Sequence, residues 1–179
     1  MVYKNDPTIM AWELVNEGQG GSYSSWASEM VTYIKSLDPN HLVGTGAGGE
    51  TSASTPGDYV SYHAHIEYGQ PSTDLTTATN TLVSYANNAY SAGKPFVLAE
   101  VGRDNHTYGD EWSVLNTLLT AVNGSHASGW LTWALTTQTD GAPTTNGWMN
   151  YWWPIQNDGS AQCVGLTNLA ASMDNNHTP

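Results

Sequence analysis

The sequence has little positive charge: 4 Lys and Arg stand against 16 Asp and Glu, giving a formal net charge of −12. Nucleic-acid backbones and anionic membrane surfaces are bound through basic patches, so both are unfavourable partners for this chain. A neutral ligand such as a sugar is indifferent to this charge. The acidic balance therefore argues against nucleic-acid and membrane binding and leaves neutral substrates open.

Cysteine and long apolar runs are also scarce. Cys163 is the single cysteine, so it forms no disulfide within the chain and no cysteine cluster for a metal. No run of about 18 apolar residues is present, so we expect no membrane span. The polar residues directly after Met1 predict no signal peptide in this chain. Phe occurs once, whereas Trp occurs 8 times and Tyr 10 times, a composition common in sugar-binding sites and also in ordinary cores.

Strand patterns alternate with helical patterns along the 179 residues, which favours a single domain over residues 1–179. The expected strands are residues 8–14, 41–49, 58–65, 95–102 and 128–135. The expected helices are residues 22–39, 74–93, 110–124 and 163–173. Because parallel strands need crossover helices, this order predicts an α/β fold of about five parallel strands with flanking helices. The segment 136–160 is too long for a simple connection, and loops of that length are usually functional.

Several aromatic residues fit the expected core. In the first helix, Trp26 and Tyr33 belong to an apolar set at helical spacing, which predicts that they pack against the strands. We expect Trp12 and Trp112 in the core as well. Glu13 shares strand parity with Glu17, and we expect it to have a structural role.

Chemistry in parallel β/α folds collects where the strands end. Asn16 and Glu17 follow the first strand, His63 and His65 end the third, Glu100 lies near the end of the fourth, and Trp133 near the end of the fifth. Two carboxylates, two imidazoles and an indole are therefore expected on one face. Glu17 is either a plain acid at the end of a strand or half of a catalytic pair, and Glu100 is the partner that the second reading requires.

The spacing of His63 and His65 is also that of metal ligands on a strand. The sequence shows no third ligand in an evident motif, so we predict no metal site. No cofactor is expected.

Four motifs carry a resemblance to a known family. "NDPTIMAWELVNE" followed by "IKSLDPNHLV", then "DYVSYHAH", "KPFVLAEVG" and "GWLTWAL", resemble glycoside hydrolase family 5, especially its β-mannanases, in order and with matching spacing. The resemblance implies a (β/α)8 barrel, of which this chain matches only the fourth to eighth strands. The expected fold is therefore a partial TIM barrel.

The resemblance also implies roles for single residues. Glu17 matches the acid/base and Glu100 the nucleophile of a mechanism that retains anomeric configuration. Asn16 would contact the sugar 2-hydroxyl, and Trp133 would stack under the sugar. His63 and His65 are expected among the substrate-binding residues, and His65 stands where the family has a tyrosine that contacts the nucleophile.

Further sugar contacts are expected from the aromatic segment 146–156. Its candidate sugar-binding residues are Trp148 and Trp152.

The implied activity is hydrolysis of internal β-1,4 bonds in a plant polysaccharide, with mannan favoured, in a secreted protein. Two alternatives stay open: a β-1,4-glucanase, and a non-catalytic carbohydrate-binding remnant of such an enzyme. An open sheet exposes its edges, so a homo-oligomer that completes the barrel is also possible.

Overall fold

The computed structural model describes residues 2–51, 54–103, 111–133 and 161–176. Its strands are β1 (Ala11–Glu13), β2 (Leu42–Gly44), β3 (Val60–His65), β4 (Phe96–Gly102) and β5 (Gly129–Thr132). Its helices are α1 (Tyr23–Leu37), α2 (Leu75–Ser91), α4 (Glu111–Asn123) and α5 (Ala161–Asn176), with the short 3₁₀ helix η1 (Ile66–Tyr68). The predicted alternation of strands and helices is confirmed. None of the described helices combines the length and the apolarity that a bilayer crossing requires.

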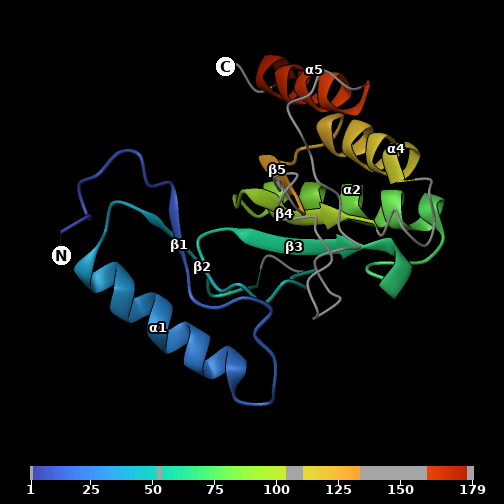
Figure 1. Cartoon of the computed structure of the whole chain (residues 1–179). Helices are drawn as coiled ribbons and strands as arrows, with labels where there is room; N and C mark the ends of the chain where they lie inside the picture. Colours follow the sequence, from blue (N-terminus) through green and yellow to red (C-terminus); the bar gives the residue numbers. More distant parts are fainter. Residues whose placement is uncertain (1, 52–53, 104–110, 134–160, 177–179) are drawn as a thin grey trace, which may run out of the picture.

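The strands form two sheets, one of β1 and β2 and one of β3, β4 and β5, and every ladder within them is parallel. In Figure 1, α2, α4 and α5 are stacked along one side of β3–β5, whereas α1 accompanies β1 and β2. The main core lies between the second sheet and its helices. It draws on three strand positions each from β3 and β4 and on helix residues, among them Val60, Tyr62, Ala64, Phe96, Leu98, Val101, Leu82, Ala86, Leu118 and Leu119.

The other face of β3 is polar. Side chains alternate between the two faces of a strand, so Ser61, His63 and His65 point away from the helices. All three are buried, with exposed fractions of 0%, 2% and 6%. Strand β3 therefore separates an apolar layer beneath the helices from a polar inner face.

One extra residue in β4 brings Glu100 to that polar face. Tyr62 pairs with Leu98 and His63 pairs with Glu100, so Ala99 has no counterpart on β3. Such a bulge shifts the side-chain alternation by one position. Leu98 and Val101 consequently both pack into the helix-side core, although their spacing would place them on opposite faces of a regular strand. Glu100 thereby lies on the same face as His63.

The first strand is shorter and more exposed than predicted. The segment 8–14 was expected to be a buried strand, but β1 has only 3 residues and no fully buried one. Met10, just before it, is 66% exposed. Among the described residues β1 pairs on one edge only, with β2, so little apolar surface is available to cover it.

The prediction that the two large aromatic residues of α1 pack against the strands was wrong. Trp26 is 39% exposed and Tyr33 is 58% exposed, whereas Ala27 and Val31 are the buried residues of the helix. The small Ala27 side chain allows the helix to approach β2 closely. The bulky rings of Trp26 and Tyr33 then remain exposed outside this contact. Trp12 is only half-buried, and Trp112 packs against the main core.

A buried ion pair joins the N-terminal segment to the end of α1. His41 Nδ1 lies 2.6 Å from Asp38 Oδ2, and His41 Nε2 lies 2.9 Å from the carbonyl oxygen of Asp6. Trp12 Nε1 donates to the same Asp38 oxygen at 2.9 Å. Burial opposes ionisation of Asp38, but hydrogen bonds from Trp12, His41 and backbone N–H groups outweigh it and hold its pKa far below the ordinary value. The hydrogen bond to Asp38 raises the pKa of His41.

These two shifts predict a window of greatest stability. The raised pKa of His41 stabilises the fold fully below about pH 6.5, and the gain is lost as the pH rises through its folded-state pKa. The lowered pKa of Asp38 stabilises the fold above about pH 4, and the gain is lost as the pH falls towards its folded-state pKa. We expect His41→Gln to lower the unfolding midpoint most between these limits and less at pH 9, as measured by circular dichroism.

His126→Gln is the matched control, because it replaces an exposed histidine outside the Asp38–His41 pair. The His126 ring instead stacks on Tyr90, with ring centroids 3.9 Å apart. If His41→Gln lowered the unfolding midpoint by the same amount at every pH, the result would contradict the ion pair.

Candidate active site

The polar residues expected at the strand ends lie together in the structure. Glu17 follows β1, His63 and His65 come from β3, and Glu100 comes from β4. His63 Nδ1 lies 3.0 Å from Glu17 Oε1 and 3.6 Å from Glu100 Oε2. His65 Nε2 lies 3.1 Å from Glu100 Oε2. His63 Nδ1 therefore faces both carboxylates, and His65 contacts the same oxygen of Glu100.

The two carboxylates differ in their exposure. The Glu17 side chain is 43% exposed, whereas the Glu100 side chain is 12% exposed. Three atoms lie within 4.8 Å of one another: one carboxylate oxygen of Glu17, one of Glu100 and one ring nitrogen of His65. These three side chains are the described residues that could together hold a metal ion. A small reacting group could also lie between the same two carboxylates.

The backbone places Glu17 in an uncommon conformation. Its φ of 52° lies in the left-handed region, which residues other than glycine rarely adopt. Leu14 N donates to Gly44 O at 3.2 Å and Gly18 N donates to Gly46 O at 3.1 Å, so the two ends of the turn are bonded to the last residue of β2 and to the segment after it. Such conformations cost about 1–3 kcal/mol and tend to occur at functional sites. We take this outlier as support for a functional role of Glu17.

A glycine allows the segment after β2 to lie against the site. Gly48 has a φ of +69°, and a Cβ added there would meet Glu17 Cγ and His63 Nδ1, both at 3.0 Å. Its carbonyl oxygen accepts a hydrogen bond from His63 N at 2.7 Å. Gly48 therefore forms part of the wall of the site and fixes the backbone of His63.

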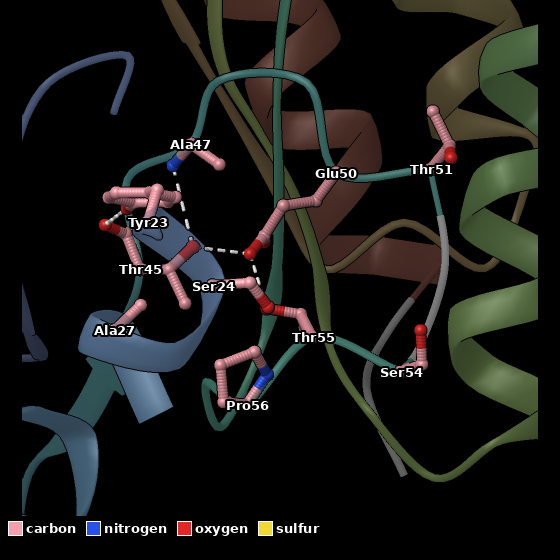
Figure 2. Close-up of a pocket in the computed structure, with 10 residues that line it drawn as sticks. All are labelled: Tyr23, Ser24, Ala27, Thr45, Ala47, Glu50, Thr51, Ser54, Thr55 and Pro56. Atoms are coloured by element: carbon pink, nitrogen blue, oxygen red, sulfur yellow. Dashed lines mark hydrogen bonds between the residues drawn. The ribbon is translucent and has the colours of Figure 1, made fainter. Parts of the chain in front are cut away.

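A buried carboxylate beside this wall holds the segment in shape. Glu50 accepts hydrogen bonds from the hydroxyls of Thr45 and Thr55 at one oxygen and from Ser61 N, at 2.8 Å, at the other. It lines a pocket between the start of α1 and residues 45–51 and 54–56, and Figure 2 shows its carboxylate between the two threonines. Lys94 Nζ donates to Thr55 O at 2.6 Å and Gly57 O at 2.8 Å, which ties down the far end of the segment.

Glu13 lies outside this arrangement but within its electrostatic reach. Burial raises the pKa of its carboxyl, and nearby His63 opposes the rise. Tyr59 donates to it at 3.4 Å. The contact with Tyr59 is of the structural kind expected for this residue.

The remaining predicted sugar contacts are only partly covered by the structure. Asn16 is exposed beside Glu17. Trp133 is 39% exposed directly after β5, and its backbone N–H donates to Val101 O at 2.9 Å. Trp148 and Trp152, with the segment 136–160, lie outside the described residues.

Sequence reasoning missed two contributors to the site: Glu50 and the bulge at Ala99. It placed the glycines of 46–49 at a strand end without a role for Gly48, although glycines after a strand often mark a close backbone approach. The bulge has no comparable signal in the sequence.

Comparison with known proteins gives these residues a context. The profile of the family described as "GH family 5 beta-mannosidase-like" matches residues 1–79. A probable mannan endo-1,4-β-mannosidase F of Neosartorya fischeri is 35% identical over 133 residues, covering 58% of this chain and 29% of that protein. Mannan endo-1,4-β-mannosidase 7 of Arabidopsis thaliana is 29% identical over 178 residues, covering 74% of this chain and 41% of that protein. The chain thus spans less than half the length of these relatives.

Solved structures share the fold. An endo-1,4-β-mannanase of Rhizomucor miehei superposes with a TM-score of 0.76 at 22% identity, over 97% of this chain and 56% of that chain. An endo-β-1,4-mannanase of Thermotoga petrophila superposes with a TM-score of 0.74 at 21% identity, over 98% and 46%. The fold is therefore part of a (β/α)8 barrel, as predicted. The resemblance read from the motifs is confirmed: over part of the barrel, this chain is similar to the β-mannosidase-like proteins of glycoside hydrolase family 5.

Proposed function

We propose that the protein is a retaining endo-acting glycoside hydrolase that cleaves β-1,4-linked mannan. The single observation that carries the proposal is the close approach of Glu17 and Glu100, with oxygens within 4.8 Å, on a chain similar to mannan endo-1,4-β-mannosidases. Retaining enzymes hold their two carboxyl groups about 5–5.5 Å apart, whereas inverting enzymes leave room for a water at about 6.5–9.5 Å. The short separation supports the retaining reaction.

The unequal environments of the two glutamates suggest which role each takes. Glu100 is the nucleophile: it attacks the anomeric carbon, and the bond from that carbon to the leaving oxygen breaks. Glu17 protonates that oxygen and then takes a proton from the water that hydrolyses the glycosyl-enzyme. The more exposed Glu17 has access to water, and the more enclosed Glu100 is held by two imidazoles.

The neighbouring side chains fit supporting roles. His63 orients both carboxylates, since its Nδ1 lies 3.0 Å from one and 3.6 Å from the other. His65 orients Glu100, taking the place of the tyrosine expected there. Asn16 and Trp133 are exposed and available to a sugar, the first for hydrogen bonding and the second for stacking. Trp148 and Trp152 remain candidates for further sugar contacts.

A non-catalytic carbohydrate-binding remnant is the second candidate. It would need only the exposed sugar contacts, Asn16 and Trp133. A β-1,4-glucanase is the alternative within the enzyme class, since an endo-β-1,4-glucanase of Xanthomonas axonopodis shares the fold with a TM-score of 0.64 at 19% identity. Turnover of soluble mannan, of soluble cellulose, or binding without turnover distinguishes these three.

We further propose that the protein acts outside the cell, as the resemblance implies. We also propose that a second copy of the chain covers the exposed edges of β1 and β5. Met10 beside β1 and Leu131 in β5 are 66% and 59% exposed, and each of these strands pairs on one edge only within the described residues. Exposed strand edges and apolar side chains favour association. A concentration-independent monomer in light scattering would contradict the second copy.

Replacement of each glutamate should separate the two roles. We expect Glu100→Gln to abolish release of reducing sugar from mannan, and Glu17→Gln to lower it about a hundredfold or more. On a mannoside with a nitrophenol leaving group, which departs without a proton, Glu17→Gln should still release nitrophenol in a first burst, whereas Glu100→Gln should not. Glu29→Gln on the exposed side of α1 is the matched control and should keep wild-type activity. Full activity in either site variant would remove that residue from its role.

Two glycine substitutions test the wall of the site. Gly48 and Gly93 have nearly equal φ values, +69° and +73°, but an added Cβ meets Glu17 and His63 at Gly48 and nothing within 4 Å at Gly93. Alanine at either position should cost about 1–2 kcal/mol of stability from the left-handed backbone alone. We expect only Gly48→Ala to lower kcat, about tenfold or more, because a misplacement of about 1 Å at the chemistry can cost about a hundredfold. Equal effects of both variants on kcat would contradict this role of Gly48.

A further inference from the structure

The structure brings together a group of potential metal ligands that the sequence did not reveal. His63 and His65 alone offered a spacing without a partner, but the fold brings two carboxylates to His65. The ligating atoms of Glu17, His65 and Glu100 lie within 4.8 Å of one another, and they come from three different strands or strand ends. Two oxygens and one imidazole nitrogen are a ligand set that zinc accepts.

One observed distance is close to that between two ligands of a bound ion. Ligands about 2.1 Å from a tetrahedral ion lie about 3.4 Å apart, and the separation of His65 Nε2 from Glu100 Oε2 is 3.1 Å. Glu17, with its side chain 43% exposed, has room to complete the set by a small movement. Three protein ligands leave a fourth position for water, as in open zinc sites.

The surroundings also favour a cation. His63 lies against both carboxylates and is 2% exposed, so it can fix their orientation as outer-shell partners do in metal sites. The formal net charge of −12 raises the local concentration of cations. The imidazole of His65 selects first-row transition ions, because Mg²⁺ and Ca²⁺ prefer ligand sets made of oxygen.

We propose that Glu17, His65 and Glu100 form a binding site for a borderline divalent cation, with Zn²⁺ as the representative ion. Binding occupies both carboxylates, so the ion competes with the sugar and inhibits the enzyme reversibly. The binding itself is independent of the proposed hydrolase activity, whereas the inhibition rests on it. His65 is the decisive ligand, because a tyrosine at this position offers a much poorer donor to zinc.

The test is titration of the untagged full chain with ZnCl₂ by calorimetry. We expect one saturable site, weakened about tenfold or more in His65→Tyr and in His65→Gln, with circular dichroism confirming that each variant is folded. His126→Gln, which removes an exposed imidazole elsewhere, should bind as the wild type does. CaCl₂ at the same concentration should neither bind nor displace zinc.

Three results would overturn the proposal: no saturable zinc binding below about 1 mM, equal affinity in the wild type and both His65 variants, or equal binding of calcium. Activity on mannan is measured in parallel, with zinc and after removal of zinc by a chelator. Absence of mannan hydrolysis with zinc binding intact would contradict the proposed function and leave the metal site standing. An active enzyme that binds no zinc would contradict the metal site and leave the proposed function standing.

Discussion

The site depends on one irregularity, the extra residue in β4. Phe96 and Leu98 point into the helix-side core, and strict alternation would direct Glu100 there as well. A carboxylate in that apolar layer would be costly to bury. Because Ala99 is left without a partner on β3, Glu100 instead pairs with His63 and lies on the polar face. The bulge therefore decides whether this chain has a carboxylate pair at all.

One face of β3 packs into the main core, and the other face carries polar residues of the site. Val60, Tyr62 and Ala64 belong to the main core on one face. On the other face, Ser61 N binds the Glu50 carboxylate and the two histidines contact Glu17 and Glu100. The imidazole contacts to Glu17 and Glu100 thus begin from a strand that is fixed from behind by close packing. This packing limits the movement of both imidazoles.

Much of the fold and part of the site could be predicted from the sequence. The alternation of strands and helices was sufficient for the parallel architecture, and the rule that chemistry lies at strand ends brought Glu17, His63, His65 and Glu100 together. The aromatic face of α1 was misjudged, because periodicity does not say whether Trp26 or the small Ala27 contacts the strands. The bulge at Ala99, the left-handed Glu17 and the Glu50 hydrogen bonds depend on pairing between distant segments, which local patterns do not contain.

The contrast between His63 and His65 links the proposed reaction to the proposed metal site. His63 Nδ1 faces both carboxylates, and its contacts to both suit a residue that positions them. His65 Nε2 lies 3.1 Å from Glu100 Oε2, and the His65 side chain is 8% exposed. A tyrosine there would donate a hydrogen bond to Glu100 and do little else, whereas an imidazole can donate a hydrogen bond or present a lone pair to a cation. In the two proposals, the histidine at this position therefore keeps the contact to Glu100 and adds an affinity for a cation that a tyrosine would not provide.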